Sequence, residues 1–226
     1  MSHGITTLTL GRGLLSVNSY LVETELGFVL VDTGTRRQRT TLTGSLRAHG
    51  CTPGMLRPVL ITHGDFDHVG SAAHLRTTFG APIGMHRGDV EMSARGDMFA
   101  GRTRPNRLVR TLTSLFARLP VNDRFEPDVL VDEGSDLTHY GLPGAQVLLL
   151  RGHSAGSIAL LLPDGSLFCG DVLENRGTPR LGSIMDDLPA AKASVARLGA
   201  MKVGTVYPGH GSPFDFDDLA AALSPP

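Results

Sequence analysis

Apolar positions recur along the first part of the chain with two different spacings, one typical of strands and one typical of helices. A period of two, or a short apolar run, predicts strands at residues 5–10, 19–24, 27–32, 58–62 and 81–85. Helical spacing predicts helices at 36–49 and at about 69–79, stopped by Gly50 and Gly80 respectively. This order of elements is typical of an α/β fold.

The last third of the chain repeats the same logic. Strands are predicted at residues 145–151, 157–162, 166–170 and 204–208. Asp164-Gly165 predicts a hairpin turn between the second and third of them. Helices are predicted near 188–199 and 215–223. Two α/β halves therefore flank a less regular middle, roughly residues 87–144, without a sequence repeat strong enough to establish duplication.

Within that middle, residues 106–119 place apolar side chains on one face of a predicted helix. Five arginines surround it: Arg102, Arg104, Arg107, Arg110 and Arg118. The favoured interpretation is an amphipathic helix packed on the body, with solvated arginines. The alternative is a lid over an active site, whose arginines meet an acidic substrate. The prediction is a single domain, 1–226, with a helical insertion or lid at about 87–144.

Composition narrows the function classes. Of 226 residues, 41% are hydrophobic and 19% charged, as in ordinary globular proteins. The net charge of -1 gives no attraction to nucleic acid or to a membrane surface, and no apolar run is long enough to span a bilayer. Two cysteines and an N-terminus without signal-peptide character indicate the cytoplasm. The expected partner is a small-molecule substrate, and the sequence indicates no oligomeric state.

Polar residues follow the predicted strands at the point where each one ends. They are Asp32, His63, His153, Asp171 and His210, and "THGDFDH" (62–68) adds Asp65, Asp67 and His68. The ends of neighbouring strands meet at one edge of an α/β sheet, where such folds bind ligands. Imidazole and carboxylate are typical ligands of zinc and, with more carboxylate, of iron or manganese. The pattern therefore predicts a hydrolytic centre of two metals bridged by a carboxylate and a hydroxide.

Five stretches, "VDTG", "THGDFDH", "RGHSAGS", "GD" and "PGHG", resemble in order and spacing the motifs of the metallo-β-lactamase fold superfamily. The resemblance implies a four-layer αββα sandwich with the metal site between its two sheets. It also implies that His63 and His153 bind one metal, that Asp171 bridges, and that a second set binds the other metal. The second set is Asp67, His68 and His210. Asp32 would orient the ligands.

Asp65 departs from this pattern, because the usual motif reads His-x-His-x-Asp-His. Flavodiiron-type relatives place a glutamate at this position, so an acidic ligand is compatible with a working centre. A carboxylate here would favour harder ions and make a bound water less acidic. Three interpretations remain: a two-metal site with Asp65 as ligand, which we favour, a site that prefers iron or manganese, or loss of the first metal.

The predicted function is that of a metal-dependent hydrolase in which a metal-bridging hydroxide attacks the carbonyl of an ester, lactone or thioester. Asp67 is the predicted catalytic residue, since a ligand that faces the hydroxide could shuttle its proton. The expected cofactors are two divalent ions, zinc first, with iron or manganese as alternatives. Two other functions stay open: an iron-dependent oxidoreductase such as a persulfide dioxygenase, and a non-catalytic metal-binding protein.

Overall fold

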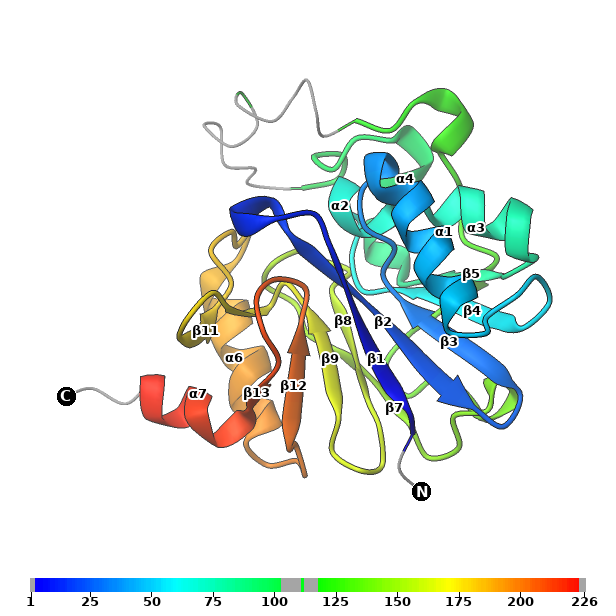
Figure 1. Ribbon diagram of the computed structural model, residues 1–226. Helices are drawn as coiled ribbons and strands as arrows, with labels where there is room; N and C mark the ends of the chain where they lie inside the picture. Colours follow the sequence, from blue (N-terminus) through cyan, green and yellow to red (C-terminus); the bar gives the residue numbers. More distant parts are fainter. Residues whose placement is uncertain (1–2, 103–110, 112–117, 224–226) are drawn as a thin grey trace.

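Two β-sheets lie face to face, and helices cover the outer face of each sheet (Figure 1). The computed structural model describes residues 3–102, 111 and 118–223. The first sheet has the order β1 (Ile5–Leu10), β2 (Val17–Thr24), β3 (Gly27–Val31), β4 (Leu56–Ile61), β5 (Ile83–Met85) and β6 (Val129–Leu130). Its first three strands pair antiparallel, whereas the pairs from β3 to β6 are parallel.

The second sheet comes from the later part of the chain. Its order is β13 (Phe214–Asp215), β12 (Thr205–Pro208), β9 (Leu167–Gly170), β8 (Ile158–Leu161) and β7 (Gln146–Leu149). Only β9 and β12 pair parallel within the described part of this sheet. A separate antiparallel ribbon is made of β10 (Leu173–Asn175) and β11 (Pro179–Leu181).

The helices divide between the two outer faces. On the first-sheet side lie α1 (Arg39–Ala48), α2 (Phe66–Val69), α3 (Ala72–Phe79) and α4 (Val90–Arg95), and on the second-sheet side α6 (Leu188–Leu198) and α7 (Phe216–Leu223) (Figure 1). Short 3-10 turns are η1 (Gly13–Leu15), η2 (Arg36–Gln38), η3 (Arg87–Asp89), η4 (Val121–Asp123) and η5 (Thr138–Tyr140). No helix in the described ranges has the length and hydropathy needed to cross a bilayer.

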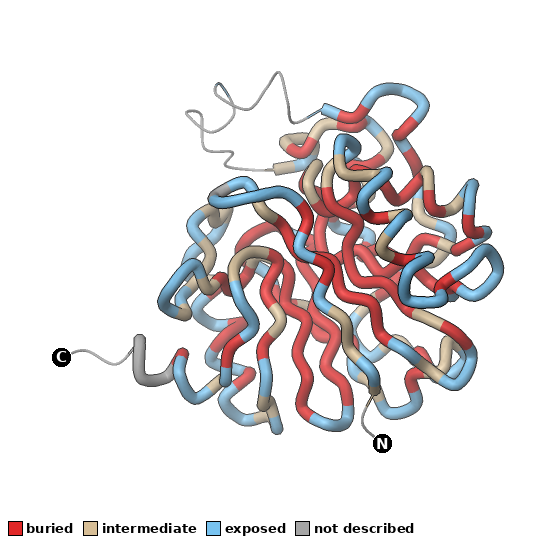
Figure 2. Tube along the Cα trace, viewed as in Figure 1, coloured by how far each residue is buried: buried red, intermediate tan, exposed pale blue. Residues whose placement is uncertain are grey.

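Strand alternation separates the apolar side chains into three layers. In β2, Tyr20 and Val22 join the cluster between the sheets, whereas Leu21 joins the cluster under α1 and α3. In β8, Leu160 faces the inter-sheet core and Leu161 faces the core under α6. Because successive side chains of a strand point to opposite faces, both sheets are apolar on both faces. The buried strands fill the centre of the molecule (Figure 2), and the predicted four-layer αββα sandwich is confirmed.

Most predicted elements are confirmed within a few residues, including the stop of α3 at Gly80, which has φ 72°. The helix predicted at about 69–79 is α3, which begins at Ala72, and the short helix α2 before it was not predicted. The strands β6, β10, β11 and β13 were missed, and β6 shows that the irregular middle contributes to the first sheet. The amphipathic helix predicted at 106–119 lies largely outside the described residues.

Candidate metal centre

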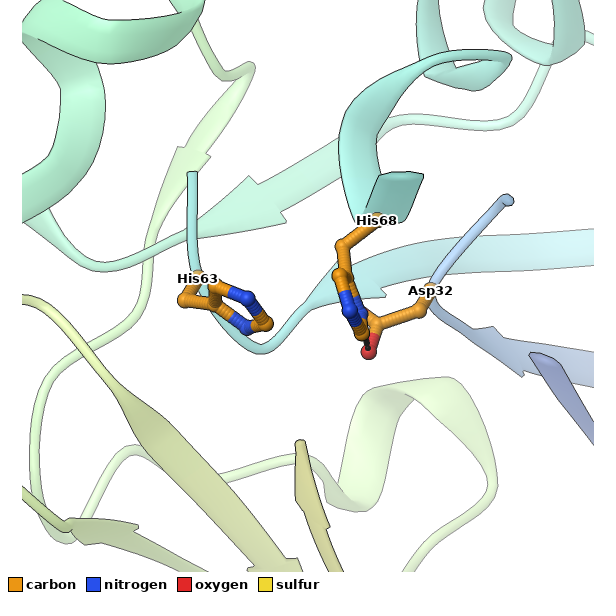
Figure 3. A group of neighbouring side chains, drawn as sticks. All are labelled: Asp32, His63 and His68. Atoms are coloured by element: carbon orange, nitrogen blue, oxygen red, sulfur yellow. Dashed lines mark hydrogen bonds and ion pairs between the residues drawn. The ribbon is translucent and has the colours of Figure 1, made fainter. Parts of the chain in front are cut away.

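The polar residues at the strand ends converge on one region. Asp32 directly follows β3, His63 follows β4, Asp171 directly follows β9 and His210 follows β12. Potential ligand atoms lie within 4.8 Å of one another in three overlapping groups: Asp32, His63 and His68; His63, Asp65 and His153; and Asp67, His68 and His210. The side chains of the first group face one another across the loop after β4 (Figure 3). These groups contain every residue expected at the site except Asp171, which lies within 3.9 Å of Nε2 of three of the histidines.

Two of the histidines are oriented by backbone carbonyls. Nδ1 of His153 lies 2.7 Å from the carbonyl oxygen of Ile184, and Nδ1 of His210 lies 2.7 Å from that of Ser16. A carbonyl oxygen only accepts hydrogen bonds, so each Nδ1 carries the hydrogen. In the neutral ring this leaves the lone pair on Nε2, the atom that faces the centre, and such an arrangement is usual for metal-binding histidines.

Asp32 orients the other two histidines. Its Oδ2 lies 2.8 Å from Nδ1 of His68 and accepts the hydroxyl of Thr62 at 2.7 Å. Because the Thr62 hydroxyl donates its hydrogen to Asp32, its oxygen accepts from Nδ1 of His63, 2.9 Å away. The buried carboxylate of Asp32 thus fixes His68 directly (Figure 3). It fixes His63 through Thr62.

The inward atoms of the site have the character of metal ligands. His63 Nε2, His68 Nε2 and Asp171 Oδ1 are buried and have no hydrogen-bond partner among the described residues. Asp171 lies between the groups: Oδ1 is 3.2 Å from Nε2 of His68, and Oδ2 is 3.2 Å from Nε2 of His210 and 3.9 Å from Nε2 of His63. Buried polar atoms normally have partners, so this convergence of imidazole nitrogens on a carboxylate fits a metal site.

The electrostatics suit metal binding at two of the ligand candidates, His63 and Asp171. Against the effect of burial, nearby carboxylates instead raise the pKa of three histidines: His68, His153 and His210. Burial, followed by the neighbouring His68 and His153, holds the pKa of His63 well below its usual value, so His63 is neutral and its Nε2 lone pair is free to bind. Burial opposes ionisation of Asp171, but His210 and His68 outweigh it and hold the pKa of Asp171 well below its ordinary value. Against the effect of burial, Asp171 raises the pKa of His210 to about 10.

Asp65 and Asp67 differ in their surroundings. The side chain of Asp65 is 5% exposed, and its Oδ2 lies 3.1 Å from Nε2 of His153 and 3.8 Å from Nε2 of His63. Asp67 is 21% exposed, with Oδ2 3.5 Å from Nε2 of His210. Asp67 is therefore the ligand candidate that solvent reaches more easily. The individual metal-binding and catalytic roles stay predictions.

Two residues at the site were missed by the sequence analysis. Arg102 was expected to be solvated, but that prediction is wrong: its side chain is 3% exposed and donates a hydrogen bond to Asp65. Burial opposes the charged form of Asp65, but the Arg102 guanidinium and His153 hold its pKa below the usual value. The local sequence carried no signal for this contact, because 37 residues separate the pair.

The second missed residue is Asp89, which is buried. An aspartate directly before a helix ordinarily predicts an N-cap, but Asp89 makes no side-chain cap to α4. Instead Oδ2 accepts from the amide of Gly64 at 3.0 Å and the hydroxyl of Ser154 at 2.6 Å, and Oδ1 accepts from the amide of Gly156 at 2.8 Å. Asp89 therefore ties the loop that carries His63 to the loop that carries His153.

The fold and the cluster of potential metal ligands are those of one class of metal-binding α/β proteins. The chain belongs to the metallo-beta-lactamase superfamily, whose family model matches residues 12–210. The chain is 31% identical to TTHA1623, solved in a di-iron-bound form, with a TM-score of 0.73 over 96% of this chain and 98% of that one. The probable metallo-hydrolase YflN of Bacillus subtilis is 23% identical over 87% of this chain and 83% of its own length. The hydroxyacylglutathione hydrolase GloC of Haemophilus influenzae is 29% identical over 55% of this chain and 53% of its own.

Proposed function

We propose that this protein is a metal-dependent hydrolase that cleaves an ester, lactone or thioester at its carbonyl carbon. The observation that carries the proposal is the convergence of His63 Nε2, His68 Nε2 and Asp171 Oδ1, buried atoms without hydrogen-bond partners in the described part of the chain. Membership of a superfamily rich in hydrolases, and the similarity to YflN and GloC, support the reaction type.

Two ligand groups share Asp171. His63, Asp65 and His153 would hold one ion, and Asp67, His68 and His210 would hold the other. When bound, divalent metals at such a site polarise a carbonyl oxygen and make water a nucleophile at neutral pH. Zinc suits the four imidazoles, and the three carboxylates leave iron and manganese open.

The chain's own groups would orient the reactants and move a proton. Asp32 keeps the Nδ1 hydrogen on His68, and through Thr62 on His63, so that both rings present Nε2 inward. Asp67, the more exposed carboxylate, is placed to take a proton at Oδ2 and to return it to the leaving alkoxide or thiolate.

The net charge of the whole chain gives a polyanionic substrate no support. At -1 the chain has no excess of positive charge that would attract a nucleic acid. An uncharged ester, lactone or thioester needs no such attraction. The similarity to GloC favours including thioesters.

Metal content and turnover measured on the same sample test the proposal. Protein purified without added metal would be analysed for bound elements, loaded with zinc, iron or manganese, and assayed on a panel of esters, lactones and thioesters. We expect two equivalents of metal and hydrolysis of at least one class. His63→Ala and His68→Ala should each lose one metal equivalent and the hydrolytic activity. His49→Ala, at an exposed histidine, is the matched control. Metal-free, inactive wild-type protein would contradict the proposal.

The di-iron form of TTHA1623 supports one alternative, an iron-dependent oxidoreductase. The same samples distinguish the two functions. Oxygen consumption with a persulfide substrate by the iron-loaded protein, without hydrolysis by any metal form, would favour the alternative. Hydrolysis by the zinc form favours the hydrolase.

A further inference from the structure

The side chain of Arg102 lies beside the predicted metal ligands. Its Nη2 donates a hydrogen bond to Oδ1 of Asp65, and its Nη1 lies 3.2 Å from Oδ1 of Asp186. The guanidinium is almost fully buried, at 3% exposure. Because burying an unpaired charge is costly, a buried arginine needs such acidic partners. Arg102 therefore connects the middle segment of the chain to the loop after β4.

Packing fixes the segment that carries Arg102. A small apolar cluster joins this segment to the ligand loop and consists of Met92, Met98, Phe66, Phe99 and Ala100. Phe66 is the residue between Asp65 and Asp67. The cluster therefore contacts the chain between these two predicted metal ligands. The amide of Arg102 also donates to the carbonyl of Phe99, at 3.4 Å. The approach of Arg102 to Asp65 is thus built into the packing of this region.

The two oxygens of Asp65 have different surroundings. Oδ1 receives the guanidinium of Arg102, whereas Oδ2 faces Nε2 of His153 at 3.1 Å and Nε2 of His63 at 3.8 Å. A carboxylate that a guanidinium holds through one oxygen, and whose other oxygen faces two imidazole nitrogens, is suited to bind a metal through that second oxygen. Hydrogen bonds to the remote atoms of metal ligands commonly set ligand orientation in this way.

Arg102 also changes the charge of the site. A carboxylate where relatives have a neutral imidazole adds one negative charge, and the guanidinium of Arg102 offsets it. The Asp65–Arg102 pair therefore has the same net charge as the histidine that it replaces. The charge-based expectation that Asp65 makes a bound water less acidic is weakened accordingly.

We propose that Arg102 is a positioning residue of the metal centre. It holds Oδ1 of Asp65 so that Oδ2 binds the ion assigned to His63 and His153, and it offsets the negative charge that Asp65 adds. This inference rests on the proposed metal centre. The opposite role is competition, in which Arg102 keeps Asp65 away from the metal. The two roles predict opposite effects on affinity.

The test compares the zinc affinities of the wild type, Arg102→Met and Arg102→Lys, measured by competition with a chelating dye. We expect Arg102→Met to weaken one of the two zinc equivalents about 10- to 100-fold and to leave the other within about threefold. Arg102→Lys should recover part of the loss, because it restores the charge without the planar fork. The visible spectrum of the cobalt-loaded protein should change in Arg102→Met. Arg95→Met, whose arginine is exposed and pairs with Glu91, is the matched control.

A double variant tests the charge offset. Asp65→His alone leaves Arg102 beside a neutral ring, with Asp186 as its remaining partner. Asp65→His with Arg102→Met restores the zero net charge that positions 65 and 102 have together in the wild type. We expect the double variant to bind two zinc ions at least about tenfold more tightly at the weaker site than Asp65→His alone. Equal affinity in the two variants would overturn the offset.

The outcomes separate this inference from the proposed function. If the wild type binds two metals and hydrolyses a substrate, but Arg102→Met binds both metals as tightly or more tightly, the positioning role is overturned and the hydrolase stands. If the wild type binds no metal, the proposed function fails first. Circular dichroism shows whether each variant is folded. If Arg102→Met does not fold, the zinc affinities of Arg102→Lys decide the test.

Discussion

Oδ2 of Asp32 lies 2.8 Å from Nδ1 of His68, and the backbone that places this carboxylate is left-handed, with φ 60°. Among the described residues, Asp32 is the one residue other than glycine with positive φ. Such a backbone costs on the order of 1 kcal/mol and persists where the surroundings enforce it. Here the enforcing contacts are the bonds to His68 and Thr62, which place the strain at the functional site.

Asp32→Asn should reduce metal affinity about 10- to 100-fold. The two oxygens of Asp32 accept from three donors: Nδ1 of His68, the backbone amide of Thr62 and the hydroxyl of Thr62. The side chain of asparagine has only one oxygen that can accept. If the amide NH₂ faces His68, the ring hydrogen moves to Nε2 and removes the lone pair that would bind metal. Chelator competition measures the change, and Asp136→Asn, in an exposed turn, is the control. Unchanged affinity would show that Asp32 does not set the tautomer of His68.

The longest elements show a period that the sequence reveals, whereas the shortest do not. β2 spans eight residues and α6 spans eleven, whereas β6 and β13 span two each. Two residues carry no periodicity. Their short length therefore explains why β6 and β13 could not be predicted from local pattern.

The site was predictable to the extent that it sits at strand ends. Asp171 follows an apolar strand directly and His210 follows one after Gly209, so the ends of these strands bring the two residues together. Arg102 and Asp89 have partners far away in sequence, and their burial depends on how the middle segment packs. Local composition around them is that of a solvated surface, and only tertiary contacts distinguish a buried arginine from an exposed one.

Asp89→Ala should lower the free energy of unfolding by about 2 to 5 kcal/mol. The change leaves the buried amides of Gly64 and Gly156 without their acceptor, at roughly 1 to 3 kcal/mol each. Urea unfolding measures the loss. Glu91→Gln, in the adjacent helix, removes an exposed ion pair with Arg95 and should cost less than about 1 kcal/mol. A loss for Asp89→Ala as small as that of the control would mean that water replaces the carboxylate.

Both cysteines should resist alkylation in the folded protein. Burial raises the pKa of Cys51 to about 11, and burial, followed by smaller effects, raises that of Cys169 to about 12. The reactive thiolate is then at most about a thousandth of either thiol at pH 8. Iodoacetamide labelling followed by mass spectrometry should be at least about 100-fold slower than in urea.

Metal binding should slow the labelling of Cys169 further, because β9 carries Cys169 and leads directly into Asp171. A ligand that binds the folded state raises the free energy of the opening that exposes this strand. Cys51, between α1 and β4, opens with a different part of the fold and is the internal control. Equal slowing at both thiols would indicate that labelling requires global unfolding, and no slowing at either would argue against metal binding near Asp171.

Gly209→Ala should lower metal occupancy while leaving the fold intact. An added Cβ at Gly209 would lie 2.1 Å from Oδ1 of Asp171 and 2.7 Å from Cε1 of His68, which is closer than non-bonded atoms approach. Both side chains must therefore move away from residue 209. Since Asp171 lies between the two ligand groups, its displacement should weaken both metal equivalents, by about 10-fold or more. Gly199→Ala, where the nearest atom is 3.4 Å away and the backbone is right-handed, should bind metal like the wild type. Full occupancy in Gly209→Ala, measured by elemental analysis after dialysis, would mean that Asp171 is not a bridging ligand.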